Sequence, residues 1–323
     1  MVRDLYIGID IGGTNLRFAL VDGAGNIRHR SRTGSAVAEG REAFCERLVA
    51  GIDELRSVAA SSGGAVMGIG AGVPGLIGRD GLIHSSVNMA ALNGFNLTTF
   101  LRERTGLPAV CGNDANLIAR GEKAYGTGRR FSSFMVVTIG TGLGSGLILD
   151  DRLWTGSGGF AAEFGHVTVE PEGIPCPCGN RGCLERYVSA GALVRFAREL
   201  LPREVLAPLE DVLDARRVAE LARRGETGAL AAFERMGRWL GIALASLADT
   251  LNLEAVIIGG GVAASFDLLV PPLSAEMAQR CFPQISSGCA IVKGELGDDA
   301  GLLGGAASAM DGAAGRTGCR QGS

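Results

Sequence analysis

Two stretches of this chain, residues 5–22 and 134–151, share one pattern of a strand-like run, a glycine-rich turn and a second strand-like run. The first reads L-Y-I-G-I-D-I-G-G-T-N-L-R-F-A-L-V-D and the second F-M-V-V-T-I-G-T-G-L-G-S-G-L-I-L-D-D. Each is a β-hairpin signature. A repeated unit of this kind predicts two related lobes, each of which begins with a hairpin and continues through strands and helices.

Helical and strand-like patterns alternate along the rest of the chain. Helical periodicity occurs at about 41–60, 98–105, 115–125, 189–200, 211–224, 228–250 and 271–280. Buried-strand runs occur at 66–72, 108–112 and 255–259. This alternation predicts an α/β fold.

The length of 323 residues also bears on the number of domains. Single cores stop growing near about 250–300 residues, so we expect two domains. We place residues 1–113 in a small lobe, joined by a C-terminal helix at 300–311, and residues 114–299 in a large lobe. Residues 312–323 lack periodicity and are expected to form a frayed tail.

One histidine and three cysteines follow at short range between two glutamates, in E-F-G-H-V-T-V-E-P-E-G-I-P-C-P-C-G-N-R-G-C-L-E. Three thiolates and one imidazole complete the tetrahedral shell that zinc prefers and leave no position for a reactive water. The sequence therefore predicts a structural zinc site. Its ligands would be His166, Cys176, Cys178 and Cys183.

The alternative for these cysteines is a set of buried apolar residues or a disulfide. Cys176 and Cys178 are too close along the chain to pair comfortably, while Gly179 and Gly182 supply the turns that wrap a backbone around an ion. A ligating imidazole is held rigidly, so its second nitrogen can face a substrate. That arrangement would place Glu163 beside a polar ligand.

Both glycine-rich turns suit a phosphate group. In D-I-G-G-T-N, Gly12 and Gly13 free backbone amides to approach an anion, Thr14 and Asn15 add donors, and Asp10 can hold a hydrated magnesium ion. One such turn would be weak evidence, because tight turns alone demand glycine. Two matched turns with hydroxyl groups favour a nucleotide clamp. The second turn contributes Thr138, Gly140, Thr141 and Gly142.

Other phosphate motifs narrow this interpretation. The P-loop pattern G-x-x-x-x-G-K-[ST] is absent from the sequence. Residues 259–264, G-G-G-V-A-A, match G-x-G-x-x-A after a strand, but no acidic residue follows at the end of a second strand, as a dinucleotide fold requires. We interpret Gly259, Gly260 and Gly261 as backbone that leaves space for a nucleoside, with close packing as the alternative.

Asn113 and Asp114 are the best candidates for catalysis. The strand L-P-A-V-C-G delivers them to a strand end just before a helix, a common position for site residues in open α/β sheets. In phosphoryl transfer an aspartate orients the attacking hydroxyl and accepts its proton. The alternative is that Asp114 serves only as the helix N-cap.

Composition excludes several other classes. The hydrophobic content is 46%, the net charge is −3, and no Lys/Arg-rich block is present, so nucleic acid is not an expected partner. No apolar run approaches the length of a membrane span, and the N-terminus lacks the apolar region of a signal peptide. We therefore expect a cytoplasmic protein without membrane contact.

Taken together, these motifs resemble the ROK family of sugar kinases and repressors. The resemblance runs through D-I-G-G-T, N-D, T-I-G-T-G-L-G, E-F-G-H, C-P-C-G-N-R-G-C-L-E and I-I-G-G-G-V, in the family's order. It implies the two-lobed actin/Hsp70/hexokinase (ribonuclease H-like) fold and ATP-dependent phosphorylation of a hexose at the 6-hydroxyl. It also implies Asp114 as general base and Asp10 near magnesium. The implied sugar contacts are Asn88, Asn113, Asp114, Glu163, His166 and Glu185.

The resemblance leaves alternatives open. Repressor members look like this body preceded by a winged-helix domain, whereas the first strand here begins by Leu5, so a kinase is the expected member. A hydrolase or dehydrogenase is disfavoured, since neither a nucleophile elbow nor a full dinucleotide fingerprint is present. The family implies a homodimer or homotetramer, and the donor could be polyphosphate or ADP instead of ATP.

The segment from Ala161 to Leu193 looks most like bacterial ROK glucokinases. Those enzymes commonly continue the region of Asn88 as N-x-P-G-W, but this chain has N-M-A-A-L there. The departure lies near the sugar in the family. Glucose is the first expectation, and N-acetylglucosamine, N-acetylmannosamine, fructose and allose remain open.

Overall fold

The structure is a computed structural model that describes residues 3–315, and the chain divides into two compact units. Unit 1 comprises Met1–Ser132, Gly146–Ala162 and Glu295–Ser323, and unit 2 comprises Ser133–Ser145 and Glu163–Gly294. We predicted a boundary after residue 113, whereas the first segment of unit 1 continues through Ser132.

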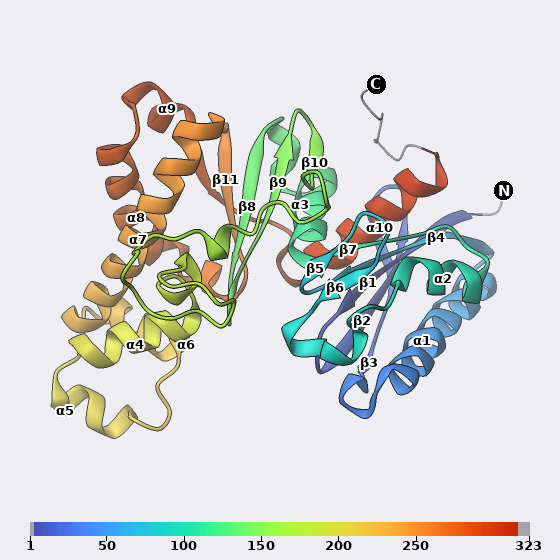
Figure 1. Ribbon diagram of the computed structural model, residues 1–323, viewed down its shortest axis with the longest axis horizontal. Coiled ribbons are helices and arrows are strands. Elements are labelled where there is room, and N and C mark those ends of the chain that lie inside the picture. The colour runs from blue at the N-terminus through green and yellow to red at the C-terminus, as the bar shows by residue number, and fades with distance from the viewer. Residues whose placement is uncertain (1–2, 316–323) are drawn as a thin grey trace. The chain divides into compact units, whose positions relative to one another are not determined.

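Unit 1 contains a five-stranded sheet in the order β3-β2-β1-β4-β7 (Figure 1). Its strands are β1 (Arg3–Ile11), β2 (Asn15–Asp22), β3 (Ile27–Gly34), β4 (Gly64–Val73) and β7 (Ala109–Asn113). The first three strands pair antiparallel, whereas β4 runs parallel to both β1 and β7. The hairpin predicted at residues 5–22 is therefore confirmed as β1 and β2.

Helices cover both faces of this sheet. They are α1 (Arg41–Ser61), α2 (Leu97–Thr105), α3 (Asp114–Tyr125) and α10 (Ala300–Ala313). Side chains of a strand alternate between faces, and on β2 Phe18 belongs to the core that contains α1, whereas Ala19 belongs to the core that contains Leu302 of α10. Figure 1 shows α1 and α10 on opposite sides of the sheet.

Helix α10 approaches the sheet so closely that two strands need glycine. A Cβ atom at Gly8 on β1 would lie 1.8 Å from the carbonyl oxygen of Leu302, and one at Gly70 on β4 would lie 1.9 Å from that of Gly305. No side chain fits at such distances, because backbone atoms of a packed helix cannot yield as a flexible side chain can. The position of α10 is thus set by the backbones of β1 and β4.

Unit 2 is built around a sheet with the order β10-β9-β8-β11-β12. Its strands are β8 (Phe134–Ile139), β9 (Leu143–Leu149), β10 (Arg152–Trp154), β11 (Ala255–Gly259) and β12 (Ala290–Lys293). Strand β11 runs parallel to β8 and β12, and β10 pairs antiparallel with β9. The boundary between the units falls within β9, so its last residues and β10 are counted with unit 1.

The helices of unit 2 are α4 (Ala190–Leu200), α5 (Arg203–Leu206), α6 (Ala215–Arg223), α7 (Thr227–Leu251), α8 (Phe266–Arg280) and α9 (Pro283–Gly288). Four of them were predicted with slightly different bounds, and the short helices α5 and α9 were not predicted. Helix α8 begins at Phe266, before the predicted residue 271. Prolines are common in the first turn of a helix, but here Pro271 and Pro272 lie inside it. The predicted tail at 312–323 lies mostly outside the described residues, and its first two residues belong to α10.

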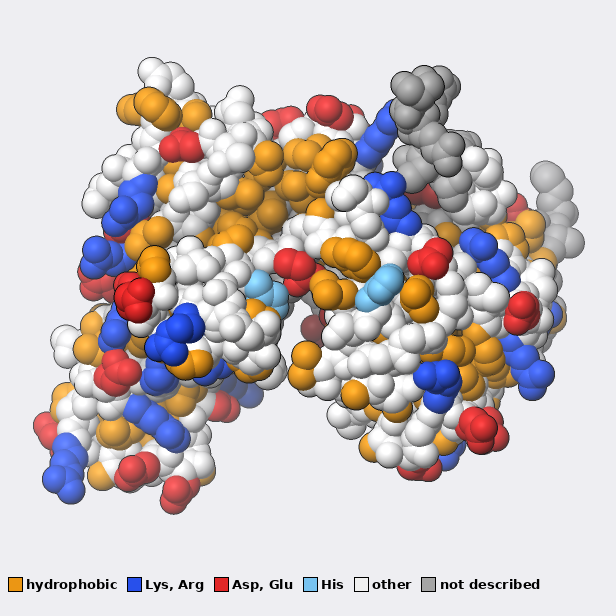
Figure 2. All heavy atoms as spheres, in the orientation of Figure 1, with side chains coloured by type: hydrophobic (Ala, Val, Ile, Leu, Met, Phe, Trp, Pro, Cys, Tyr) orange, Lys and Arg blue, Asp and Glu red, His pale blue; other side chains and the backbone are white. Residues whose placement is uncertain are grey.

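The surface carries mixed charges on the face drawn in Figure 2. Lys and Arg side chains are interspersed with Asp and Glu side chains, and the described residues form no continuous basic area on that face. In the part of the chain that the structure covers, no helix is both long enough and apolar enough to cross a membrane.

Candidate active site

Asn113 and Asp114 lie at the junction between β7 and α3. The Asn113 side-chain oxygen accepts a hydrogen bond from the Asn116 amide at 3.1 Å, and its side-chain nitrogen donates to the Gly75 carbonyl oxygen at 3.1 Å. Asn113 is therefore the N-cap of α3. The alternative role of Asp114 as the cap is wrong. Its carboxylate accepts a hydrogen bond from the adjacent Ala115 amide at 2.9 Å.

The surroundings of Asp114 favour its protonated form. Burial raises the pKa of its carboxyl group, the negative charge of Asp10 raises it further, and the hydrogen bond from the Ala115 amide opposes both. A carboxylate with a raised pKa is a stronger base than an exposed aspartate. These properties suit a group that accepts a proton from a hydroxyl.

Asp10 stands at the end of β1 opposite Arg17 of β2. Arg17 Nε donates to Asp10 Oδ2 at 2.8 Å, and Arg17 Nη2 binds the same oxygen. Arg17 also donates to the Asp298 carbonyl oxygen at 3.1 Å, which fixes the guanidinium group. Arg17 was not predicted as a site residue, although the antiparallel register of the hairpin pairs it with Asp10.

The turn between β1 and β2 is bound to the end of β3. The Gly12 amide donates to the Asn15 carbonyl oxygen at 2.9 Å, which closes the turn. The Ser35 amide donates to the Thr14 carbonyl oxygen at 2.9 Å, and its hydroxyl donates to the Gly13 carbonyl oxygen at 2.7 Å. The hydrogen bonds from Ser35 thus fix the conformation of the turn, which is predicted to bind phosphate.

Asn88 lies against this turn, and Asn15 at its end makes a further contact. A Cβ atom at Gly13 would lie 3.3 Å from the Asn88 carbonyl oxygen and 3.7 Å from the Asn88 Cβ. Asn88 belongs to the 3-10 helix η2 (Val87–Leu92) and is exposed. Asn15 accepts a hydrogen bond from Arg32 Nε at 3.2 Å through its side-chain oxygen. Unit 1 therefore brings Asn88 next to the first glycine turn.

The second glycine turn connects β8 and β9 in unit 2. The Gly140 amide donates to the Gly142 carbonyl oxygen at 2.9 Å, and the Leu143 amide donates to Glu185 Oε2 at 2.8 Å. A Cβ atom at Gly142 would lie 2.4 Å from Glu185 Oε2. Glu185, which is predicted to contact the sugar, therefore also stabilises this turn.

The third glycine segment adjoins the second turn. Strand β11 pairs with β8 so that Gly259 lies opposite Thr138, and a Cβ atom at Gly259 would meet the Thr138 methyl group at 3.5 Å. Gly260 has φ +78°, and a Cβ atom there would lie 2.5 Å from the Ile139 carbonyl oxygen. Gly261 begins the 3-10 helix η7 (Gly261–Ser265). The backbone of Gly260 is thus packed closely against β8, whereas the space next to Gly261 is open.

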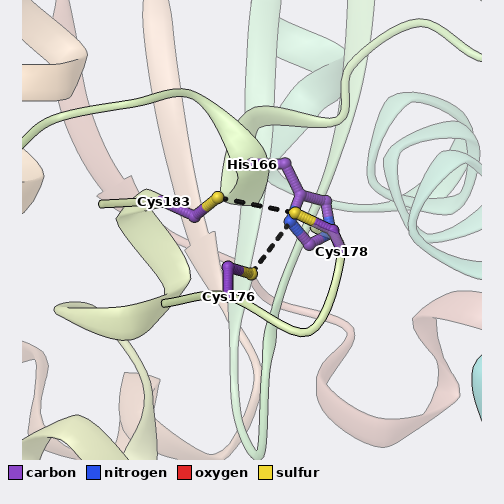
Figure 3. A group of neighbouring side chains, drawn as sticks. All are labelled: His166, Cys176, Cys178 and Cys183. Atoms are coloured by element: carbon purple, nitrogen blue, oxygen red, sulfur yellow. Dashed lines mark hydrogen bonds between the residues drawn. The ribbon is translucent and has the colours of Figure 1, made fainter. Parts of the chain in front are cut away.

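The four predicted metal ligands converge in unit 2, where Figure 3 shows their side chains turned toward a common centre. Their ligand atoms lie within 4.8 Å of one another. Cys176 Sγ lies 3.8 Å from His166 Nδ1, and Cys178 Sγ lies 3.6 Å from Cys183 Sγ. In a tetrahedral site with bonds of about 2.3 Å, neighbouring sulfur ligands lie about 3.8 Å apart. The spacing and the donor types fit a tetrahedral metal ion.

Hydrogen bonds hold the cysteine loop in this conformation. Asn180 Nδ2 donates to Cys183 Sγ at 3.4 Å and to Thr168 Oγ1 at 2.9 Å, and the Cys176 amide donates to the Asn180 carbonyl oxygen at 2.8 Å. The Asn180 amide also lowers the pKa of the Cys178 thiol, which favours the thiolate that binds metal. Asn180 was not among the predicted site residues.

Glu163 and His166 are positioned by the short 3-10 helix η4 (Phe164–His166). The His166 amide donates to the Glu163 carbonyl oxygen at 3.0 Å. The Phe164 amide donates to the buried Ser145 hydroxyl at 3.2 Å, which ties this segment to β9. Since His166 also belongs to the Cys/His cluster, the cluster and Glu163 are held by one turn of chain.

A family model described as the ROK family matches residues 6–311. The chain belongs to the ROK family. A glucokinase of Thermotoga maritima is 36% identical to this ROK chain over 307 residues, which are 93% of this chain and 95% of the relative. A xylose repressor of Bacillus subtilis is 30% identical over 303 residues, which are 92% of this chain and 75% of the repressor.

A similar solved structure belongs to the same family. The crystal structure of a ROK family glucokinase from Streptomyces griseus in complex with glucose and AMPPNP has a TM-score of 0.79 and 32% identity. The similarity covers 95% of this chain and 99% of that chain. The predicted actin/hexokinase-like fold and the predicted family are therefore confirmed for this ROK chain.

Proposed function

We propose that this ROK chain transfers the γ-phosphoryl group of ATP to the 6-hydroxyl of glucose, with magnesium as the cofactor. The chain is a sugar kinase, since its family and its glucokinase relatives agree along nearly its whole length. The environment of Asp114 is the main support for phosphoryl transfer. Asp114 lies at the start of α3 with a raised pKa, while Asn113 supplies the helix cap.

Each residue then has a defined task. Asp114 accepts the proton of the attacking hydroxyl, and Asn88, Asn113, Glu163, His166 and Glu185 bind the hydroxyl groups of the sugar. The amides of both glycine turns bind the phosphate groups of the nucleotide, and the Gly259–Gly261 segment leaves space for the nucleoside. Magnesium, when bound, neutralises charge that develops on the transferred phosphoryl group. Asp10 offers the carboxylate oxygen that this ion prefers.

We propose zinc for the Cys/His cluster. Three sulfur atoms and one imidazole nitrogen at tetrahedral spacing support this choice, because soft thiolate ligands select zinc over magnesium. With four protein ligands the ion would have no open position. Its task is to hold His166, and through the same turn Glu163, in a fixed orientation toward the sugar.

The choice of glucose as the substrate rests on similarity to the glucokinases and is the most specific element of the proposed function. The segment after Asn88 differs from the pattern typical of glucokinases, and here Met89 and Leu92 are buried in the core of unit 1. A loop anchored by these side chains can still present Asn88. N-acetylglucosamine, N-acetylmannosamine, fructose and allose are the alternatives to test. A cytoplasmic homodimer or homotetramer remains our prediction.

A coupled assay of ADP release tests the proposal directly. Purified protein with ATP and magnesium is assayed on glucose and on the four alternative sugars, with Asp114→Asn as the inactive control. We expect the highest kcat/KM on glucose. Activity on another sugar alone would replace glucose in the proposal, and no activity on any sugar with ATP, ADP or polyphosphate would refute the kinase.

The similarity to a xylose repressor supplies a competing prediction. A regulator would bind the sugar without turnover and would bind DNA. Gel-shift titration of the full chain with mixed genomic fragments, with and without sugar, distinguishes the two classes. We expect no sugar-dependent shift.

A further inference from the structure

Unit 1 contains a cavity of about 830 Å³ that the proposed reaction does not use. Its walls come from β7, α3 and α10 and from the segments around β5 (Leu76–Ile77) and β10. A volume of this size accommodates a small metabolite. Among the described residues, Asn113 is the single member of the proposed sugar and nucleotide site that lines it.

The cavity carries an excess of guanidinium groups. Arg79, Arg120 and Arg152 line it together with Asp151 and Asp311. Both carboxylates already have a cation, because Arg120 Nη2 lies 2.6 Å from Asp311 Oδ2 and Lys123 binds Asp151. Within residues 3–315 no carboxylate forms a salt bridge with Arg152. The wall therefore favours an anionic ligand.

A second observation points to a ligand with hydrogen-bond donors. Asn116 lines the cavity, is 4% exposed, and has a side-chain oxygen that no donor within the described chain reaches. A buried acceptor without a hydrogen-bond donor is unfavourable. A hydroxyl group of a bound molecule would satisfy this oxygen after a small rotation of the amide. The cavity thus combines a site for an anion with a site for a hydroxyl.

We propose that this cavity is a second ligand site, which binds a small phosphate monoester with free hydroxyl groups, of the class of sugar phosphates. The phosphate group is bound by Arg152 with Arg79 and Arg120, and Asn116 accepts a hydrogen bond from a hydroxyl. The apolar side chains of Val110 and Leu117 face the carbon skeleton.

The position of the cavity couples it to catalysis. The Asn116 amide donates to the Asn113 side chain, and Asn113 immediately precedes Asp114. The ligand would thus contact the side chain of the residue whose backbone amide completes the cap of α3, one residue from the proposed base. We expect binding to lower turnover without competing with the sugar. This effect on turnover rests on the proposed function, whereas binding itself does not.

The test is isothermal titration of the full chain with glucose 6-phosphate, in the presence of excess glucose and AMPPNP to fill the proposed active site. We expect one equivalent to bind. Arg152→Ala should weaken binding by about tenfold or more, since it removes a charged hydrogen bond, and Arg152→Lys should weaken it less. The matched control is Arg129→Ala, because Arg129 is also exposed in unit 1 but lies outside the cavity. Thermal unfolding checks that each variant is folded.

Several results would overturn the proposal. One is an unchanged affinity in Arg152→Ala, and another is no binding to the unsubstituted chain at about 10 mM ligand, a range in which specific sites are occupied. If inorganic phosphate bound as tightly as glucose 6-phosphate, the proposed hydrogen bond between Asn116 and a ligand hydroxyl group would be wrong. A titration without glucose and AMPPNP separates the two proposals: if the chain is not a kinase, one equivalent that is sensitive to Arg152 still binds.

Discussion

Replacing Asp114 by Asn tests the proposed base while leaving the fold in place. The substitution removes a proton acceptor, and a positioned general base contributes about 10²–10⁴-fold to a rate, or about 3–5 kcal/mol of barrier. The helix cap is not lost, because Asn113 supplies it, and the new side-chain oxygen can still accept from the Ala115 amide. We therefore expect kcat to fall by that factor while the affinity for glucose changes little.

The same substitution has an unusual expected effect on stability. Burial and Asp10 raise the pKa of Asp114, so the ionised carboxylate destabilises the folded chain above its pKa. A neutral amide removes this penalty, and Asp114→Asn should be as stable as the unsubstituted chain or more stable at pH 8. The advantage should vanish as the pH falls below about 4, the ordinary aspartate value, where the carboxyl is protonated in both states.

Steady-state kinetics and urea unfolding measure both effects, with Asp53→Asn as the control. Asp53 is on α1, is exposed, and has no part in the site. For the unsubstituted chain, the fall of kcat at low pH should have its midpoint above about 3.9. The reasoning would be refuted if Asp114→Asn kept more than about a tenth of kcat, or if it lost more than about 1 kcal/mol of stability, since either result contradicts the assigned role.

Three further predictions follow from single contacts. Cys178→Ser should lower the zinc content measured by elemental analysis and raise the KM for sugar about tenfold, and Cys45→Ser, the control, should do neither. Gly70→Ala should destabilise the chain by about 1–3 kcal/mol or more in urea unfolding, because its methyl group meets the backbone of α10, and an equal effect of Gly23→Ala, where space is open, would contradict this. Asp22→Asn should lose about 2 kcal/mol at pH 7: burial opposes ionisation, but hydrogen bonds from Asn26, Arg28 and Ala24 lower the pKa of Asp22 to about 2. That difference should shrink as the pH falls from about 4 toward about 2, and a difference that stays constant would exclude the carboxylate as its source.

Local patterns were sufficient to predict part of the structure. The two hairpins are visible because apolar periodicity and a glycine turn are contained within some twenty residues, and the structure has them as β1–β2 and β8–β9. The Cys/His cluster is visible for a similar reason, since its ligands lie close along the chain. Strand β3 was missed because I-R-H-R-S-R-T-G has little apolar periodicity and forms a strand by pairing with β2.

Features that depend on distant segments could not be predicted. The C-terminal helix at 300–311 was expected to join the N-terminal lobe, but nothing local indicates that Gly146–Ala162 belongs to the same unit. The ion pair of Asp10 with Arg17 requires the register of the hairpin, which the strand pattern alone does not fix. The roles of Asn113 and Asp114 were ambiguous for a related reason. Both residue types can cap a helix, and the hydrogen bond from Asn116 decides between them.

Helix α10 connects these distant features to the chemistry of the site. It packs against β1, which ends near Asp10, and against α3, which begins with Asp114, and the Arg120–Asp311 ion pair joins α3 to α10. Asp10 and Asp114, whose charges interact, thus stand on elements that both pack against α10. Gly8 and Gly70 permit the close approach of α10 to β1 and β4. A side chain at either position would clash with the backbone of α10. We therefore expect Gly8→Ala and Gly70→Ala to disturb the packing of the elements that carry the two aspartates.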